Sequence, residues 1–136
     1  MSDILLVGRM DVTGHADVID HRHAGVRDFQ GFLLGRPSPL VVVIARLQDH
    51  AKYPKSEQLL AAGCAAHGIL LAAYAQGIGA VWRTGDLAYS PHVAKGLGLA
   101  EGEQVIAFLY LGTPQKEPRV AEKEDLTKFV SAWSGN

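Results

Sequence analysis

The pattern of apolar and polar positions divides the chain near residue 36. Before that point no window keeps a helical or strand period for long, apart from the short runs ILLV and GFLL. Every acidic residue in this part is Asp and every strong base is Arg. We therefore treat residues 1–36 as an atypical N-terminal segment, for which irregular structure is one interpretation. Residues 37–136 are the regular part of one domain.

From residue 37 onward the pattern predicts three strands. The run SPLVVVIARL follows Pro37 and is continuous in β-branched residues, which is typical of a strand buried on both faces. The run IGAVWR predicts a second strand, and EQVIAFLYLG, from Glu103 to Gly112, predicts a third that is again buried.

A long helix is predicted between the first two strands, from Ser56 to Gly77. Pro54 and Ser56 are start signals and Gly77 is a stop signal. At 1.5 Å per residue the helix is roughly 33 Å long. It is apolar on all sides, which predicts burial on all sides. Because one small core rarely surrounds such a helix, we expect a second copy of the chain to cover part of it in a homodimer.

Two shorter segments also carry helical signals. SPHVAKGLGL has Ser90 as the N-cap and Pro91 at the first helical position, and a glycine closes the helix. In the tail, EDLTKFVSAW places four apolar residues at helical spacing, namely Leu126, Phe129, Val130 and Trp133. This tail either docks as a short helix or crosses to a partner chain. The order strand, long helix, strand, short helix, strand predicts one domain of the α+β or α/β class.

Composition narrows the classes of partner. Of the 136 residues 48% are hydrophobic and 20% charged, as in an ordinary soluble globular protein. The formal net charge of −1 argues against nucleic acid or an anionic membrane as a partner. Leu59 to Ala75 is uncharged but built largely from Ala and Gly, so we expect it to be a helix of a soluble protein and not a bilayer span. The first residues carry no signal-peptide pattern, so a cytoplasmic location is expected.

Hydrolytic and metal chemistry find little support in the sequence. Cys64, the single cysteine, lies three residues from His67 on the predicted helix, but its Ala and Leu surroundings favour a packing role. His15, His21 and His23 lack a carboxylate at a helical ligand spacing, so we expect surface histidines and no metal site. G-x-S-x-G, Walker A and G-x-G-x-x-G motifs are all absent from the sequence.

The end of the second strand is the best candidate for a binding site. A strand leaving the core there presents Trp82, Arg83 and Thr84 where ligand sites collect in α/β sheets. Arg83 offers a planar fork of donors that suits phosphate, carboxylate or an anionic ring, and Gly85 lets backbone N–H groups approach a ligand. The competing interpretation is a buried Trp82 with Arg83 paired to Asp86 or to another surface carboxylate.

Several motifs together resemble the FMN-dependent nitroreductase family, in its small single-domain bacterial branch. They are the small-residue helix containing GCAAHGILLAAYAQG, the turn GIGAVWRTG, the helix start SPHVAKGLGL and the strand FLYLGTP, in the family's order and spacing. The match runs from about Pro39 to Gln115. It implies an α+β, nitroreductase-like fold with a central long buried helix and a mixed sheet.

The resemblance also implies a cofactor, a partner and a reaction. Members are homodimers that bind FMN at the interface and pass a hydride from NADH or NADPH to nitroaromatic or quinone-type acceptors. By resemblance, Trp82, Arg83, Thr84 and Gly85 contact the flavin. The stretch matched to the nicotinamide nucleotide consists of Ala72, Ala73, Tyr74, Ala75, Gln76 and Gly77. The flavin carries out the redox chemistry, so no catalytic side chain is assigned.

The chain also departs from the family pattern. Family members begin with an Arg-Arg-Ser motif that holds the FMN phosphate, followed by a loop ending in Gln-Pro-Trp. Neither motif occurs in this sequence, where HRHAGVR is the nearest substitute. The alternative function is therefore a non-catalytic relative that acts as a dimeric structural protein or as a flavin- or nucleotide-binding protein.

Overall fold

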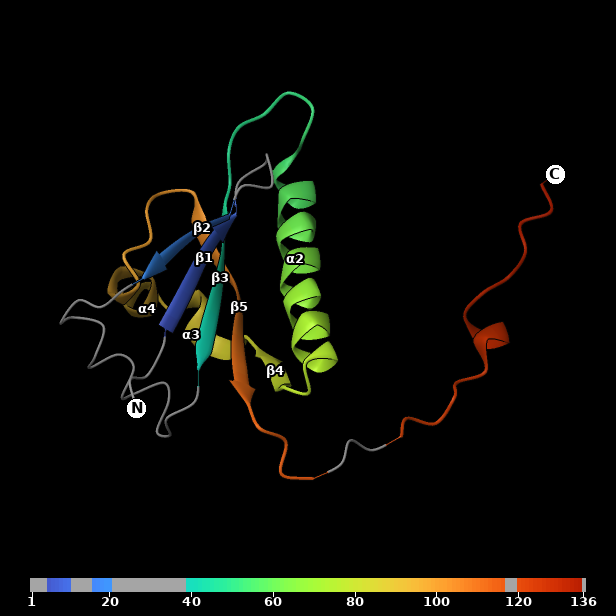
Figure 1. Ribbon diagram of the computed structural model, residues 1–136. Coiled ribbons are helices and arrows are strands. Elements are labelled where there is room, and N and C mark those ends of the chain that lie inside the picture. The colour runs from blue at the N-terminus through green and yellow to red at the C-terminus, as the bar shows by residue number, and fades with distance from the viewer. Residues whose placement is uncertain (1–4, 11–15, 21–38, 117–119, 136) are drawn as a thin grey trace.

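A computed structural model describes residues 5–10, 16–20, 39–116 and 120–135 of the chain. A five-stranded sheet in the order β2-β1-β3-β5-β4 forms its centre (Figure 1). The strands are β1 (Leu5–Met10), β2 (Ala16–Asp20), β3 (Leu40–Arg46), β4 (Gly79–Arg83) and β5 (Glu103–Gly112). The helices are α2 (Lys55–Ala75), α3 (Gly85–Tyr89) and α4 (Pro91–Gly96), and a 3-10 turn spans Leu126–Lys128. β1 pairs with β3 in parallel and the other pairs are antiparallel, so the predicted α+β class with a mixed sheet is confirmed.

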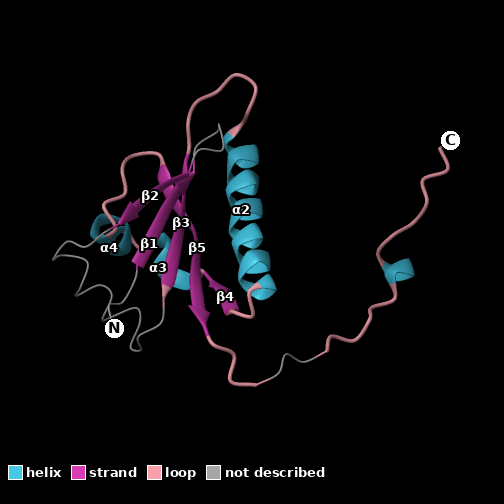
Figure 2. Ribbon diagram, viewed as in Figure 1, coloured by secondary structure: helices cyan, strands magenta, loops and turns pink. Residues whose placement is uncertain are grey.

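Strand β3 is the central strand and is buried on both faces, as its apolar run predicts. Leu40, Val42 and Ile44 belong to one hydrophobic core cluster, and Val41 and Val43 belong to another. The first cluster is covered by α3 and α4, and the second by α2. Figure 2 shows these helices on the two sides of the sheet. The molecule therefore has three layers, which explains why a strand at its centre contains no polar side chain before Arg46.

Helix α2 ends in a Schellman motif at Gly77. The Ile78 N–H donates to the Ala73 carbonyl at 2.9 Å, and the Gly77 N–H donates to the Tyr74 carbonyl at 3.0 Å. Gly77 has a φ of 72°, a left-handed conformation that glycine adopts without a steric penalty. The predicted stop signal is confirmed, and the motif turns the chain directly into β4.

Only one side of α2 is buried within the chain. The buried residues are Gln58, Ala62, Ala66 and Ala73, which face the sheet. Leu60, Leu71 and Tyr74 are 70%, 56% and 74% exposed. Burial on all sides, expected from the apolar sequence, is not reached by one copy because a single sheet can cover only one face of a helix. The prediction that a second copy covers the other face stays a prediction.

By length and composition alone, α2 is also apolar enough to cross a membrane. One such helix is weak evidence for a membrane span, because helices of soluble proteins meet the same criterion.

The region after β4 contains one expected helix and one unexpected helix. In α4 the Ser90 Oγ accepts a hydrogen bond from the Val93 N–H at 3.4 Å, and Pro91 occupies the first turn, as predicted. Helix α3 was not predicted because its five residues are too few to show a helical period. It begins at Gly85, whose φ is 59°.

Two strands lie inside the segment that the sequence led us to consider irregular. β1 lies beside β3 and β2 pairs with β1. The expectation of irregular structure does not hold for these two stretches, because pairing of β1 with β3 and of β2 with β1 supplies backbone hydrogen-bond partners whatever the side-chain pattern. Residues 21–36 fall outside the described residues.

The tail after β5 has little regular structure. Its predicted helix is reduced to the 3-10 turn Leu126–Lys128, and Phe129 and Trp133 are exposed. Thr127 donates hydrogen bonds from its hydroxyl and its backbone N–H to Asp125, and these bonds lower the pKa of that carboxyl. A lowered pKa means that the capped turn is favoured while Asp125 is charged and is weakened as acid protonates it. In Figure 1 this tail extends away from the sheet.

Candidate functional site

Neighbouring residues at the end of β4 point to opposite faces of the sheet. Side chains alternate along a strand, and the register pairs Arg83 with Phe108 but Trp82 with Leu109. Phe108 belongs to the core cluster under α3 and α4, whereas Leu109 belongs to the cluster under α2. Trp82 and Arg83 therefore take part in different environments although they are adjacent in sequence.

Trp82 lies against α2. A Cβ atom built at Gly63 would be 3.9 Å from the Cη2 atom of Trp82, so the indole covers this glycine at ordinary van der Waals distance. The residue remains 36% exposed. Its contact with α2 fits the competing interpretation of Trp82 as a packing residue, and part of its side chain remains accessible.

Arg83 lines a cavity of about 720 Å³ on the other face. The other residues that line it come from β4, β5 and the start of α3, and they are Val81, Thr84, Gly85, Asp86, Leu87, Phe108 and Tyr110. This volume is within the range of small-molecule sites, roughly 300–1,000 Å³. The cavity combines an aromatic and aliphatic wall with a cation, a hydroxyl and a carboxylate at its polar side.

The guanidinium of Arg83 makes no salt bridge with another residue in the described ranges. The expected alternative, an Arg83–Asp86 ion pair, is not present there. An arginine at the edge of a cavity without an ionic partner retains its donors for an anionic group of a ligand. The arrangement therefore suits a ligand with a flat apolar part and an anionic part.

The residues expected to contact the nicotinamide nucleotide lie apart from this cavity. Ala72 to Gly77 form the last turn of α2 and its cap, next to the start of β4, whereas Arg83 ends that strand. Ala73 is buried, and the other five residues of this stretch are exposed. Gln76 donates from Nε2 to the Ala72 carbonyl at 3.0 Å. Within one chain the two predicted groups do not form a single site.

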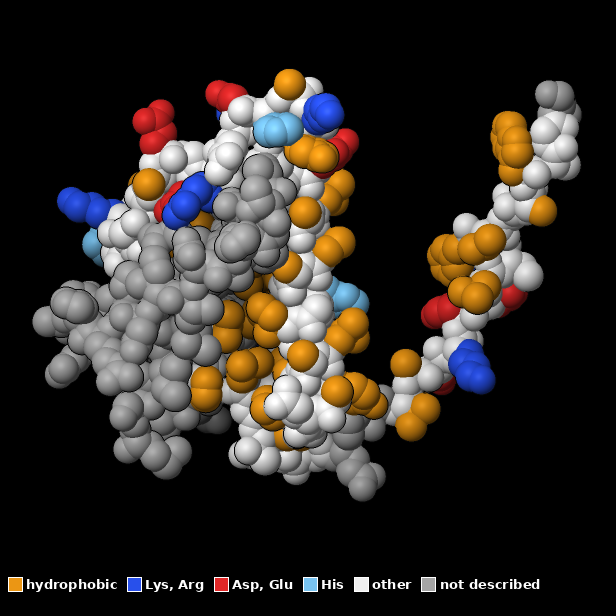
Figure 3. Space-filling model, turned by 45° about the horizontal axis from the view of Figure 1, so that its top comes forward, with side chains coloured by type: hydrophobic (Ala, Val, Ile, Leu, Met, Phe, Trp, Pro, Cys, Tyr) orange, Lys and Arg blue, Asp and Glu red, His pale blue; other side chains and the backbone are white. Residues whose placement is uncertain are grey.

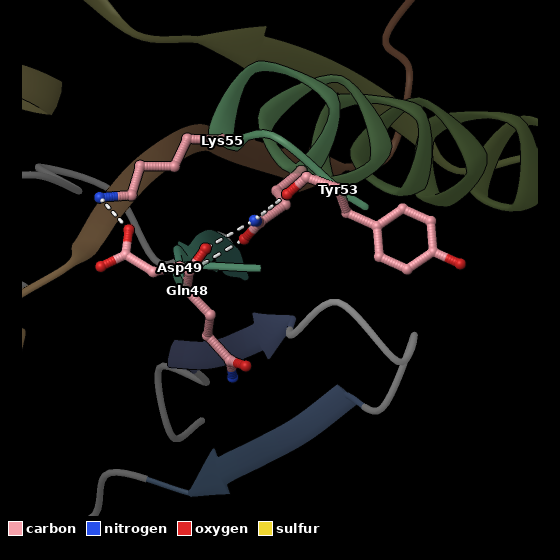
Figure 4. A network of polar contacts seen from close by, with 5 residues as sticks. Gln48, Asp49, Tyr53 and Lys55 are labelled. Carbon is pink, nitrogen blue, oxygen red and sulfur yellow. Dashed lines mark hydrogen bonds and ion pairs between the residues drawn. The ribbon is translucent and has the colours of Figure 1, made fainter. Parts of the chain in front are cut away.

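A second hollow, of about 620 Å³, lies where β3 leads into α2. Gln58 holds the loop beside it: its Oε1 accepts from the Gln48 N–H at 2.9 Å, and its Nε2 donates to the carbonyls of Gln48 and Tyr53, both at 2.8 Å. Lys55 and Asp49 form an ion pair at 2.9 Å (Figure 4). The hydrogen bonds of Gln58 are satisfied internally, so this network has a structural role.

The other candidate groups that the structure describes show no catalytic arrangement. Cys64 and His67 are both exposed on α2 instead of packed in the core, because they lie on the face turned away from the sheet. Among the described residues no group of three or more His, Cys, Asp or Glu side chains could hold a metal ion. His15, His21 and His23 lie outside the described residues.

Phe108 and Tyr110 are among the cavity-lining residues that the sequence did not identify. Both belong to β5, whose sequence is apolar at every position from Val105 to Leu111. The only available signal is their two-residue spacing, which places both side chains on one face. Which face that is follows from the register with β4, a property of the tertiary structure.

Comparison with known proteins gives a consistent result. A model of the "Nitroreductase family" matches residues 19–113. The Escherichia coli K12 protein "Putative NAD(P)H nitroreductase YdjA" is 42% identical over 96 residues, covering 69% of this chain and 52% of that protein. The Haemophilus influenzae protein "Putative NAD(P)H nitroreductase" is 35% identical over 103 residues, covering 71% of this chain and 56% of its own length. The chain thus spans about half the length of the curated relatives it matches.

A solved structure shows the same fold. The nitroreductase-like family protein from Bacillus cereus matches with a TM-score of 0.66 and 24% identity, over 83% of this chain and 62% of that one. The family match begins at residue 19, before the boundary at residue 37 that the change in sequence pattern indicated.

Proposed function

Because the chain belongs to the nitroreductase family, we propose that it binds FMN as part of an NAD(P)H-dependent oxidoreductase. The observation that carries this proposal is the cavity at the end of β4, where Arg83 has no ionic partner among the described residues and faces an apolar wall. The relatives named as NAD(P)H nitroreductases support the same reaction class.

The residues of the cavity fit one end of a flavin nucleotide. Arg83 and Thr84 would hold an anionic or carbonyl group, and Phe108 and Tyr110 would lie beside the flat ring. Asp86 would favour donor groups of the ligand, since a carboxylate accepts hydrogen bonds. When bound, FMN supplies the hydride transfer from NADH or NADPH to a nitro or quinone acceptor, and the chain supplies binding and electrostatics.

The proposal includes a homodimer in the cytoplasm. Its support is the exposed apolar side of α2, which one copy of the chain leaves uncovered (Figure 3). Contiguous apolar surface of this kind marks interaction sites on soluble proteins. A dimer would also place the last turn of α2 of one copy near residues of the other, a way to complete a site that one chain does not form alone.

The test is the visible absorption spectrum of the purified chain, before and after incubation with FMN and desalting. Retained flavin at one molecule per chain supports the proposal. Colourless protein that retains no FMN contradicts it and supports the alternative, a non-catalytic dimeric relative. Oxidation of NADPH with a quinone acceptor then separates an enzyme from a flavin carrier, since a carrier binds FMN without turnover.

A further inference from the structure

The cavity beside Arg83 is lined by polar side chains that the described part of the chain does not engage. Neither the Arg83 guanidinium nor the Asp86 carboxylate takes part in an ion pair or a side-chain hydrogen bond with another described residue. Thr84 directly precedes α3, but its hydroxyl makes no capping hydrogen bond. A cation, a hydroxyl and a carboxylate therefore line one cavity with their hydrogen-bonding capacity unused.

Arg83 and Asp86 have opposite charges but do not neutralise each other. Arg83 is the last residue of β4 and Asp86 lies in the first turn of α3, with the chain turning between them at Gly85. Because the two side chains line the same cavity without forming an ion pair, each is available to a different group of a ligand. A ligand edge that offers an acceptor to Arg83 and a donor to Asp86 matches both.

These charges disfavour the phosphate end of a flavin nucleotide in this cavity. A phosphate monoester carries a charge of about −1.5 to −2 at neutral pH. Arg83 would attract it and Asp86 would repel it. No other charged side chain among the described residues lines the cavity, so the charges of the lining cancel. The cavity therefore offers a phosphate no net electrostatic attraction.

The imide edge of the flavin ring fits the same two side chains. This edge consists of an N–H group between two carbonyl groups, so it offers one donor flanked by two acceptors. A guanidinium donates to a carbonyl oxygen and a carboxylate accepts from an N–H, which are the roles open to Arg83 and Asp86. Phe108 and Tyr110 in the cavity wall suit the flat ring that carries this edge.

We propose that the cavity takes the imide edge of a flavin ring and not its phosphate, and that Asp86 selects for the ring N–H. The inference rests on the flavin binding proposed above and specifies which part of the ligand this chain recognises. The family resemblance implies flavin contacts for residues 82–85, and Asp86 is an addition to them. It follows that riboflavin, which has no phosphate, binds about as tightly as FMN.

The test compares the binding of three flavins to the full chain, measured by quenching of their fluorescence on titration with protein. Riboflavin differs from FMN only in lacking the phosphate, and 3-methylriboflavin also lacks the ring N–H. Riboflavin should bind with a dissociation constant within about tenfold of that of FMN, because a solvent-exposed charge contributes little to binding. 3-Methylriboflavin should bind about 10- to 100-fold more weakly than riboflavin, since it loses a hydrogen bond to a charged group.

Two variants assign this discrimination to Asp86. Asp86→Ala removes the acceptor and the bulk beside it, so the preference for riboflavin over 3-methylriboflavin should fall below about tenfold. The variant should fold normally, because Asp86 is exposed and its side chain has no partner among the described residues. Glu101→Ala removes an exposed carboxylate that does not line the cavity, and it should keep the preference of the unaltered chain.

The possible outcomes separate this inference from the proposed function. Riboflavin binding more than about tenfold weaker than FMN binding would mean that the chain holds the phosphate, and it overturns the inference alone. The same holds if the unaltered chain does not discriminate against 3-methylriboflavin, or if Asp86→Ala keeps the full discrimination. A chain that binds neither FMN nor riboflavin overturns the proposed flavin binding and with it this inference.

Discussion

At the scale of single residues, the alternation of a strand decides what each side chain of β4 can do. Trp82 faces α2 and covers Gly63, whereas Arg83 faces the cavity beside Tyr110. The family resemblance implies that both contact the flavin. In the proposed site Arg83 has the direct role, whereas Trp82 has a contact with α2 that stabilises the helix against the sheet. Substitutions at the two positions should therefore have different consequences.

Arg83→Ala is expected to weaken FMN binding by about 10- to 100-fold, because a hydrogen bond to a charged group contributes about 1.5–3 kcal/mol. Arg83→Lys keeps the charge but loses the planar fork, so its affinity should be intermediate. Quenching of FMN fluorescence on titration with protein measures the FMN affinity of each variant and of the unaltered chain. Lys95→Ala, an exposed cation of α4 that does not line the cavity, is the matched control. Unchanged affinity in Arg83→Ala would remove Arg83 from the site.

Trp82→Ala is expected to lower the free energy of unfolding by about 2 kcal/mol, since a large, partly buried aromatic contact is lost. Trp82→Phe keeps part of that contact and should lose less. Urea unfolding followed by circular dichroism measures both. FMN affinity should fall less in Trp82→Ala than in Arg83→Ala. The reverse order would show that the indole contacts the ligand directly.

At the scale of elements, the loop between β3 and α2 depends on one buried side chain. Gln58, 8% exposed, uses its amide to satisfy backbone groups of Gln48 and Tyr53. A loop without regular structure has no repeating hydrogen bonds of its own, so a side chain of the adjacent helix supplies them. The start of α2 is thereby fixed to the end of β3.

Gln58→Leu is expected to cost about 2–4 kcal/mol of stability, because it leaves one backbone N–H and two carbonyls of the loop without their partner. Gln48→Ala is the matched control, since Gln48 contributes only backbone atoms to this network and is exposed. Its stability should stay within about 0.5 kcal/mol of the unaltered chain. Urea unfolding of the two variants side by side measures the difference, and equal losses would contradict the role given to Gln58.

At the scale of the whole molecule, the described residues leave much apolar surface exposed on α2 and on the tail. Leu60 and Tyr74 of α2 are 70% and 74% exposed, and Trp133 of the tail is 93% exposed. A soluble protein rarely leaves such surface in water. The expectation that the tail crosses to a partner chain is compatible with this exposure and stays a prediction.

Leu71→Lys is expected to weaken the proposed dimer at least about tenfold, because it places a charge on the exposed apolar side of α2. The variant should fold normally, since Leu71 is exposed in the single chain. Tyr89→Lys, which changes an exposed aromatic residue of α3 on the other side of the sheet, is the control and should leave association unchanged. Sedimentation without detergent measures both. A chain that stays in solution only with detergent would contradict the soluble dimer.

Local signals in the sequence determined the elements of the regular part. The β-branched run predicted β3, the capping residue predicted the start of α4, and Gly77 predicted the end of α2. These features were predictable because each depends on backbone conformation and on neighbours within a few residues. The same signals and their order were specific enough to indicate the family, which the comparison confirms.

Only the tertiary structure determines which face of each element packs against which neighbour. Periodicity could not separate the sheet side of α2 from its exposed side, since both are apolar, and it could not place Tyr110 in the cavity that Arg83 lines. The register between β4 and β5 settled the second point. Periodicity did not predict β1 either, because the pairing of β1 with β3 depends on backbone hydrogen bonds between distant segments. Sequence patterns report local conformation, whereas a site made from several strands depends on which residues the fold brings together.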